Sequence, residues 1–272
     1  MSSLRVDDVS VAFGGVRAVD AVSLEVSPGT LTGLIGPNGA GKTTLLDACT
    51  GFVAARGEIR LAGERIDGLP PYRRARKGLV RTFQSLDLFD DLTVGGNVAV
   101  GAALGGHHRW WHQLRPRPAA DAPAVREALR QVGLEGMADL APNRLSQGRR
   151  ALVALARALV ARPVVLLLDE PAAGLDTHES EELGERLRAI RDRGTALLLV
   201  EHDMGLVLGH CDYVYVLDQG KLLASGTPQE IRRNDAVLTA YLGGPADGAE
   251  GESTAVVPTG ADPVEPKEGS TR

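Results

Sequence analysis

The sequence contains few cysteines and few aromatic residues, no long apolar run and no excess of positive charge. Its two cysteines, Cys49 and Cys211, lie far apart among apolar residues, so we expect reduced thiols rather than a disulfide framework. No apolar run reaches the ~18 residues that a membrane-spanning helix needs, so other chains must supply any membrane spans. Because the first residues lead directly into a strand-like pattern, we expect no secretory signal.

Negative charge is concentrated at one end of the chain. The formal net charge of −5 argues against general nucleic-acid binding, which needs a basic surface. Residues 245–272 hold six acidic and two basic residues, which accounts for four of the five negative charges. The Gly, Pro, Ala, Glu and Thr of this segment bury too little apolar surface to order it. We therefore expect one domain over residues 1–244 and a disordered acidic tail over residues 245–272.

Residues 36–43, Gly-Pro-Asn-Gly-Ala-Gly-Lys-Thr, have the spacing of a phosphate-binding P-loop and follow the apolar run 31–35. The glycines let backbone N–H groups turn toward phosphate oxygens, and the N-terminus of the next helix favours negative charge. The alternative is a glycine-rich turn that happens to precede a lysine. We predict that Lys42 reaches the β- and γ-phosphates and that Thr43 offers its hydroxyl to Mg²⁺. The nucleotide-binding residues would be Gly36, Pro37, Asn38, Gly39, Ala40, Gly41, Lys42, Thr43 and Thr44.

Two acidic residues follow an uninterrupted apolar run at 164–168. Such a run predicts a strand buried on both faces of a parallel sheet. Asp169 and Glu170 then stand at the carboxyl end of that strand, where buried charge is costly unless it has a task such as holding Mg²⁺ and polarising water. A second apolar strand at 195–200 ends in Glu201-His202-Asp203.

The N-terminal residues alternate in the manner of strands at 4–13 and 19–26, joined by the turn Gly14-Gly15. Phe13, just before the turn, is either a stacking platform or a core residue. A strand at 78–83 delivers Gln84 at its end. Three helices are each expected to follow a capping side chain, which is Thr93 for 94–102, Asp121 for 123–132 and Asp235 for the last helix, ending at 242.

Residues 105–118 have a distinct composition, with three of the six histidines and both tryptophans. His108 and His112 have i, i+4 spacing, so one interpretation is a metal site, although no carboxylate or cysteine lies nearby. The second interpretation is a protruding basic and aromatic loop that touches a partner or a membrane surface. The third is an unspecialised solvated insertion.

Taken together, these motifs resemble one family, the ATP-binding subunits of ABC transporters, over residues 4 to about 243. By this resemblance residues 36–43 are the Walker A loop, and Asp169 with Glu170 completes Walker B. The remaining assignments implied by the resemblance are Phe13 as the aromatic that stacks on adenine, Gln84 as the glutamine that senses Mg²⁺ and the γ-phosphate, Ser146 and Gly148 as parts of the signature motif, Asp176 in the D-loop, and His202 as the switch histidine.

The resemblance implies an α/β fold: a P-loop NTPase with a RecA-like core, an N-terminal antiparallel β-subdomain and an inserted α-helical subdomain at about 84–145. Catalysis would use Glu170 to activate water, with His202 and Gln84 near the γ-phosphate, while Mg²⁺ would be held by Thr43, Gln84 and Asp169. ATP would bind between the P-loop of one subunit and the signature helix of another, in a head-to-tail dimer. The dimer, of identical or different ATPase subunits, would drive two transmembrane permease subunits from the cytoplasmic face of the plasma membrane.

Within the family, segments 78–84, 88–94, 201–204 and 226–228 look like the importer subunits for branched-chain amino acids and related amides, which work with an extracytoplasmic substrate-binding protein. ATPases of lipopolysaccharide export share much of this pattern and are an alternative. Three residues depart from the family pattern. Gln147 replaces a residue that is often Gly or Tyr, Gly96 stands where the subgroup has Glu on the helical subdomain, and Arg149 replaces the signature Gln.

Arg149 also raises an alternative of another class. A cation at a helix N-terminus opposes the helix dipole by roughly 0.3–1 kcal/mol, so the alternative is a nucleotide-binding or regulatory module with an impaired site. Glu170 favours an active ATPase instead. A non-transport protein of the family, acting in translation or DNA repair, would carry a second such domain or a coiled-coil insertion, and this sequence has neither.

Overall fold

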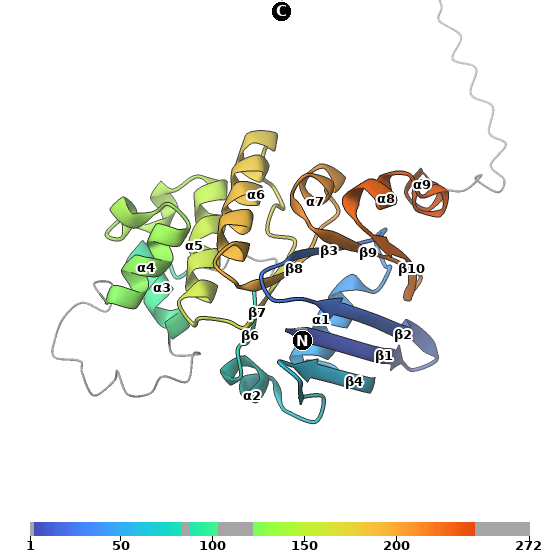
Figure 1. Ribbon diagram of the computed structural model, residues 1–272. Coiled ribbons are helices and arrows are strands. Elements are labelled where there is room, and N and C mark those ends of the chain that lie inside the picture. Colours follow the sequence, from blue (N-terminus) through green and yellow to red (C-terminus); the bar gives the residue numbers. More distant parts are fainter. Residues whose placement is uncertain (1–2, 83–87, 103–121, 243–272) are drawn as a thin grey trace, which may run out of the picture. The chain divides into compact units, whose positions relative to one another are not determined.

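The computed structural model describes residues 3–82, 88–102 and 122–242 (Figure 1). The described residues form two β-sheets with helices packed on them. The predictions for Gln84, for residues 105–118 with His108 and His112, and for the tail at 245–272 lie outside the described residues. Within the described part of the chain, no helix is both long and apolar enough to cross a bilayer.

The larger sheet has the strand order β10-β9-β3-β8-β7-β6. Strands β9, β3, β8, β7 and β6 run parallel, and β10 pairs antiparallel with β9. Every residue of β3, β7 and β8 is buried, which confirms the strands predicted from the apolar runs. The bounds are β3 (Leu31–Ile35), β6 (Leu79–Arg81), β7 (Val165–Asp169), β8 (Ala196–Val200), β9 (Tyr213–Asp218) and β10 (Lys221–Gly226).

The larger sheet separates two hydrophobic cores. Along β7, Leu166 and Leu168 enter one core while Val165 and Leu167 enter the other, because successive side chains of a strand point to opposite faces. Helices α5 (Gln147–Leu159), α6 (Thr177–Arg191) and α7 (Met204–His210) cover the first face, and α1 (Lys42–Thr50) with the smaller sheet covers the second (Figure 1). The carboxyl ends of the parallel strands therefore lie together at one edge.

The smaller sheet is antiparallel, with the order β2-β1-β4-β5. It consists of β1 (Leu4–Phe13), β2 (Val16–Val26), β4 (Arg56–Leu61) and β5 (Glu64–Arg65). Strand β1 matches its prediction, but β2 begins at Val16 rather than Val19, because Phe13 pairs with Val16 directly across the Gly14-Gly15 turn. Asp8 and Ala21 adopt positive φ angles of 47° and 52° beside shifts in register, which identifies β-bulges in this hairpin.

Helices α3 (Val94–Ala102) and α4 (Pro123–Gln131) pack against α5. The Thr93 cap is confirmed, since the Gly96 N–H donates to the Thr93 hydroxyl at 3.1 Å. The close approach of α3 and α5 depends on Gly101, where a Cβ atom would collide with the Arg157 carbonyl oxygen. The α4 prediction was one residue too long, and its N-cap position is Ala122 rather than Asp121, which lies outside the described residues.

Two short helices, α8 (Pro228–Arg232) and α9 (Asp235–Leu242), follow β10. Thr227 and Glu230 form a capping box at the start of α8. Asp235 is the first residue of α9 and not its cap. The Asn234 Oδ1 atom accepts from the Ala236 and Val237 N–H groups at 3.0 and 3.2 Å instead.

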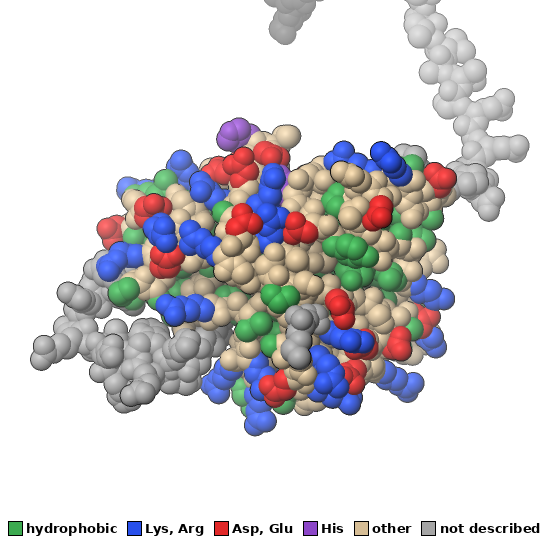
Figure 2. Space-filling model, viewed as in Figure 1, with side chains coloured by type: hydrophobic (Ala, Val, Ile, Leu, Met, Phe, Trp, Pro, Cys, Tyr) green, Lys and Arg blue, Asp and Glu red, His purple; other side chains and the backbone are tan. Residues whose placement is uncertain are grey.

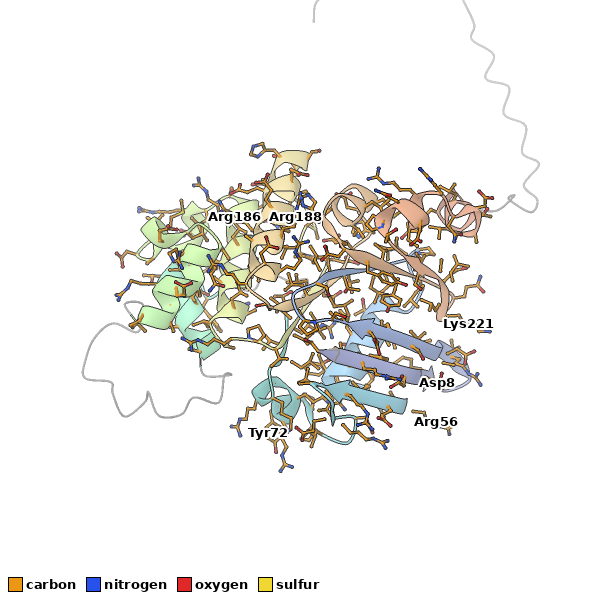
Figure 3. All side chains as sticks on the ribbon, viewed as in Figure 1. Asp8, Arg56, Tyr72, Arg186, Arg188 and Lys221 are labelled. Atoms are coloured by element: carbon orange, nitrogen blue, oxygen red, sulfur yellow. The ribbon has the colours of Figure 1, made fainter. Side chains whose placement is uncertain are left out.

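Helix α1 is held at its C-terminus by the neighbouring helix α2 (Pro71–Arg76). The Arg74 guanidinium, 4% exposed, donates to the carbonyl oxygens of Ala48 at 2.7 Å and Cys49 at 2.8 Å, and also to those of Asp67 and Leu69. The bonds to Ala48 and Cys49 lie in the last turn of α1, where a helix leaves carbonyl oxygens without the usual intrahelical donors. On the same helix Tyr72 projects outward and is 55% exposed (Figure 3). Acidic and basic side chains are interspersed over the face shown in Figure 2.

Candidate functional site

The P-loop connects β3 to α1 and is fixed by two glycines. Gly36 and Gly41 have φ angles of 154° and 98°, which favour glycine. A Cβ atom at Gly36 would also collide with the Leu217 carbonyl oxygen, and one at Gly41 with that of Ala18. The loop thus packs directly against the backbone of both sheets, and Gly41 occupies the N-cap position of α1 with no side-chain cap. The first N–H groups of α1 are left for a ligand.

Lys42 folds back over the loop that precedes it. Its Nζ atom donates to the Gly36 and Pro37 carbonyl oxygens at 2.7 and 3.1 Å, and the residue is 6% exposed. Burial lowers the pKa of Lys42, while the carboxylates of Glu170, Asp169 and Glu201 oppose that shift. The ammonium group is therefore placed to exchange two carbonyl oxygens for phosphate oxygens.

A cavity of about 220 Å³ brings Glu170 to the P-loop. Glu170 has a positive φ of 48°, and its N–H donates to the Val200 carbonyl at 2.9 Å, so the chain turns sharply after β7. Gly36 and Pro37 are not among the residues that line this cavity. Their carbonyl oxygens accept hydrogen bonds from Lys42 Nζ. The cavity is lined by Ala18, Asn38, Gly39, Ala40, Gly41, Lys42, Thr43, Thr44 and Glu170.

His202 and Glu201 follow the end of β8 beside Glu170. The His202 Nδ1 atom lies 3.8 Å from Glu170 Oε1, and the imidazole is 58% exposed. Glu201 is 1% exposed and accepts the N–H groups of Ala172 at 2.8 Å and His202 at 3.3 Å. Burial raises the pKa of Glu201. This carboxyl group ties the segment after Glu170 to the segment that carries His202.

Asp169, at the end of β7, has a basic partner that the sequence did not indicate. The Arg81 guanidinium at the end of β6 donates to Asp169 Oδ2 and to Asp47 Oδ1 of α1, each at 2.6 Å. The side chains of Arg81 and Asp169 are 5% and 6% exposed.

The donor set at this edge fits Mg²⁺, because the Thr43 hydroxyl and the Asp169 carboxylate are the hard oxygen ligands that Mg²⁺ prefers. Among the described residues, no group of three or more His, Cys, Asp or Glu side chains can hold a metal. A cation at this edge would therefore take further oxygen ligands from phosphate and water, as is usual for Mg²⁺.

The signature residues line a second cavity, of about 300 Å³, between α5 and α6. Ser146 caps α5, its hydroxyl accepting from Arg149 N–H at 3.4 Å, and Gly148 N–H donates to Glu179 Oε1 at 3.2 Å. Asp176 caps α6 by accepting from Glu179 N–H at 2.8 Å. The lining residues are Ser146, Gly148, Arg149, Leu152, His178, Glu179, Glu182 and Leu183.

The two cavities share no lining residue, and neither Ser146 nor Gly148 lines the P-loop cavity. Phe13 is 53% exposed at the end of β1, which rules out the interpretation of Phe13 as a core residue. It does not line the P-loop cavity. Sequence reasoning missed the roles of Arg81, Glu201 and Glu179, and the one signal available was their position at strand ends or in the first turn of a helix.

Both cysteines are buried and unpaired with each other, as predicted. Burial raises the pKa of the Cys49 and Cys211 thiols to about 12. Neither thiol is therefore part of the chemistry of the P-loop cavity.

Two known family profiles match parts of the chain. A family profile described as "ABC transporter" matches residues 19–173. A second profile, described as "Branched-chain amino acid ATP-binding cassette transporter", matches residues 221–247. The first match contains the P-loop and the Asp169-Glu170 pair.

Individual relatives match most of the chain. The high-affinity branched-chain amino acid transport ATP-binding protein LivG of Salmonella typhimurium is 42% identical over 248 residues, which covers 88% of this chain and 97% of that protein. BraF of Pseudomonas aeruginosa, named for the same transport, is 40% identical with the same coverage. The solved structure of the ADP conformation of MJ1267, an ATP-binding cassette of an ABC transporter, is 29% identical, with a TM-score of 0.79 over 89% of this chain and 99% of that one.

Proposed function

Because the chain belongs to the ABC transporter family of ATP-binding proteins, we propose that it is the ATP-hydrolysing subunit of an importer for branched-chain amino acids or related amides. Relatives named for that transport match 88% of the chain, and residues 221–247 match the profile of the same subgroup. The C-terminal match disfavours the alternative of a lipopolysaccharide exporter.

The observation that carries the proposal is the P-loop cavity, which joins a phosphate cradle to a carboxylate. Backbone N–H groups of residues 39–44 and the N-terminus of α1 bind the phosphates. Lys42 Nζ leaves the Gly36 and Pro37 carbonyls for the β- and γ-phosphate oxygens. Thr43 and Asp169, together with Gln84, would hold Mg²⁺, which would supply positive charge to neutralise the γ-phosphoryl group.

Glu170 is the proposed general base. Its carboxylate lines the cavity beside Lys42 and Thr43, so it can orient the attacking water and accept its proton. His202, 3.8 Å from that carboxylate, bridges the water and the γ-phosphate. The Glu201 carboxylate accepts the N–H group of Ala172, which follows Glu170 closely in sequence, and that of His202. It therefore holds the backbone near both Glu170 and His202.

The complete site requires a second subunit. Since the signature cavity is separate from the P-loop cavity, Ser146 and Gly148 of one subunit bind the ATP held by the P-loop of the other in a head-to-tail dimer. Phe13, exposed at the end of β1, stacks on adenine. The dimer drives two permease subunits at the cytoplasmic face of the plasma membrane, with an extracytoplasmic binding protein supplying the cargo. The helical subdomain at about 84–145 docks the permeases.

The test is light scattering of purified Glu170→Gln protein with and without ATP, alongside phosphate release by the unmutated chain. We expect an ATP-dependent dimer of the variant and measurable release by the unmutated protein. Rapid turnover by Glu170→Gln contradicts the assignment of the base. A dimer without release by the unmutated chain favours the impaired module that Arg149 suggests.

The cargo needs its own experiment. The chain is reconstituted in liposomes with the permease subunits and binding protein from neighbouring reading frames. Leucine-loaded binding protein should then stimulate phosphate release more than the unloaded protein does. Equal release with both forms contradicts the proposed cargo without affecting the ATPase assignment.

A further inference from the structure

Arg81 links the P-loop helix to the carboxyl end of β7. Strand β6 pairs in parallel with β7, with Arg81 opposite Leu167, so the Arg81 side chain reaches the same sheet edge as Asp169. Its NH2 group donates to Asp169 Oδ2 and its NH1 group to Asp47 Oδ1, both at 2.6 Å. Asp47 lies on α1, the helix that begins at Lys42. One guanidinium thus links α1 to the end of β7. Helix α1 lines the P-loop cavity with its first residues, and Glu170, the residue after β7, also lines it.

The charges in this linkage are largely removed from water. The Arg81 and Asp169 side chains are 5% and 6% exposed, and that of Asp47 is 30% exposed. A buried carboxylate is strongly destabilised without a cation beside it. The planar fork of arginine can donate to two carboxylates at once, which a lysine ammonium does not reproduce. In the structure, Arg81 donates directly to Asp169 and compensates its charge, while Lys42 adds a second positive charge that acts on Asp169 by Coulomb attraction.

This geometry places Arg81 in competition with any cation that Asp169 binds. We propose that Arg81 competes with Mg²⁺ for the Asp169 carboxylate and so sets the Mg²⁺ concentration required for nucleotide binding. The inference rests on the proposed function, in which Asp169 holds Mg²⁺. Arg81 donates to Oδ2 of Asp169, so a cation that uses this oxygen must displace the guanidinium. Its positive charge also opposes a divalent cation at the same group.

Arg74 provides a matched control on the same protein. Arg74 is also a buried arginine that donates to groups of α1, and 4% of the residue is exposed. None of its hydrogen-bond partners among the described residues is a carboxylate of the P-loop cavity, however, because these partners are the carbonyl oxygens of Ala48, Cys49, Asp67 and Leu69. Loss of Arg74 therefore costs stability without changing the charge around Asp169.

The experiment measures thermal unfolding of the full chain with a non-hydrolysable ATP analogue across a Mg²⁺ titration. The readout is the Mg²⁺ concentration that gives half of the stabilisation. An opposite charge within a few ångströms shifts the ionisation of a carboxylate by an order of magnitude or more. By the same electrostatics, Arg81→Gln should lower this midpoint about tenfold, whereas Arg74→Gln should lower the melting temperature and leave the midpoint unchanged.

Asp47→Asn supplies a prediction of opposite sign on a partly exposed residue. It removes a negative charge that Arg81 neutralises together with that of Asp169, so more of the Arg81 charge opposes a cation at Asp169 and the Mg²⁺ midpoint should rise. This variant decides the question even if Arg81→Gln does not fold, since an unchanged or lowered midpoint for Asp47→Asn overturns the inference. An Arg81→Gln midpoint that is unchanged or raised also overturns it. If the unmutated chain shows no Mg²⁺-dependent stabilisation, the proposed function fails together with the inference.

Discussion

Replacing the buried Arg74 by methionine should lower the free energy of unfolding of the chain. Its guanidinium makes four hydrogen bonds, of which the two to the Ala48 and Cys49 carbonyls of α1 are buried. A buried acceptor left unsatisfied costs about 1–3 kcal/mol, and this applies to the Cys49 carbonyl, because the Ala48 carbonyl still accepts the Gly51 N–H at 3.3 Å. The carbonyls of Asp67 and Leu69 are partly buried, and water can replace the lost donor there.

The expected loss in unfolding free energy is therefore about 2 kcal/mol, the middle of that range. For a chain of this size, 1 kcal/mol corresponds to about 2–4 °C in melting temperature, which predicts a fall of roughly 4–8 °C. The assay is urea and thermal unfolding followed by circular dichroism. Arg73→Met, on the exposed face of the same helix, is the control and should change stability by less than about 0.5 kcal/mol. A loss below about 1 kcal/mol for Arg74→Met refutes the reasoning that these bonds cap α1.

Three further predictions concern side chains in or near the site. Phe13→Ala should weaken nucleotide binding by about 1–3 kcal/mol if Phe13 stacks on adenine, and an unchanged dissociation constant in a fluorescence titration contradicts stacking. Burial raises the pKa of Glu201 above its ordinary value of 4.5, so the stability that this group contributes is full below that value and is lost as the pH rises through the folded-state pKa. Urea unfolding of Glu201→Gln should accordingly depend less on pH than that of the unmutated chain, and parallel profiles contradict the assignment. With a pKa of about 12, the Cys49 and Cys211 thiols should react with a thiol reagent only after denaturation, and fast labelling of the native chain contradicts their burial.

Local signals predicted much of the fold. The P-loop was identifiable because strand, glycine loop and helix are consecutive in sequence. The buried strands were identifiable because every residue of β8, and every residue of β7 before Asp169, is apolar. The capping residues of helices were harder to predict, because several polar residues near each helix start can serve as the cap. Asn234 rather than Asp235 caps α9 for that reason, and β2 extended to Val16 because tertiary pairing with Phe13 outweighed its weak local pattern.

Contacts between distant residues were not predictable in the same way. Arg81 and Asp169 are 88 positions apart, and nothing in the sequence around either residue indicates the other. Glu201 was visible at a strand end, but its bonds to Ala172 and His202 depend on how the turn after Glu170 lies beside β8. The roles of the P-loop, signature and Walker B residues remain predictions that the proposed experiments address.

The two glycines at either end of the P-loop also limit how this gene can vary. A single-nucleotide missense change in any glycine codon introduces a residue that carries a Cβ atom. At Gly36 that atom meets the backbone of β9, and at Gly41 it meets the backbone of β2. Neither obstacle is a flexible side chain that can move aside. These two codons therefore have no neighbouring amino acid that the loop accepts without shifting.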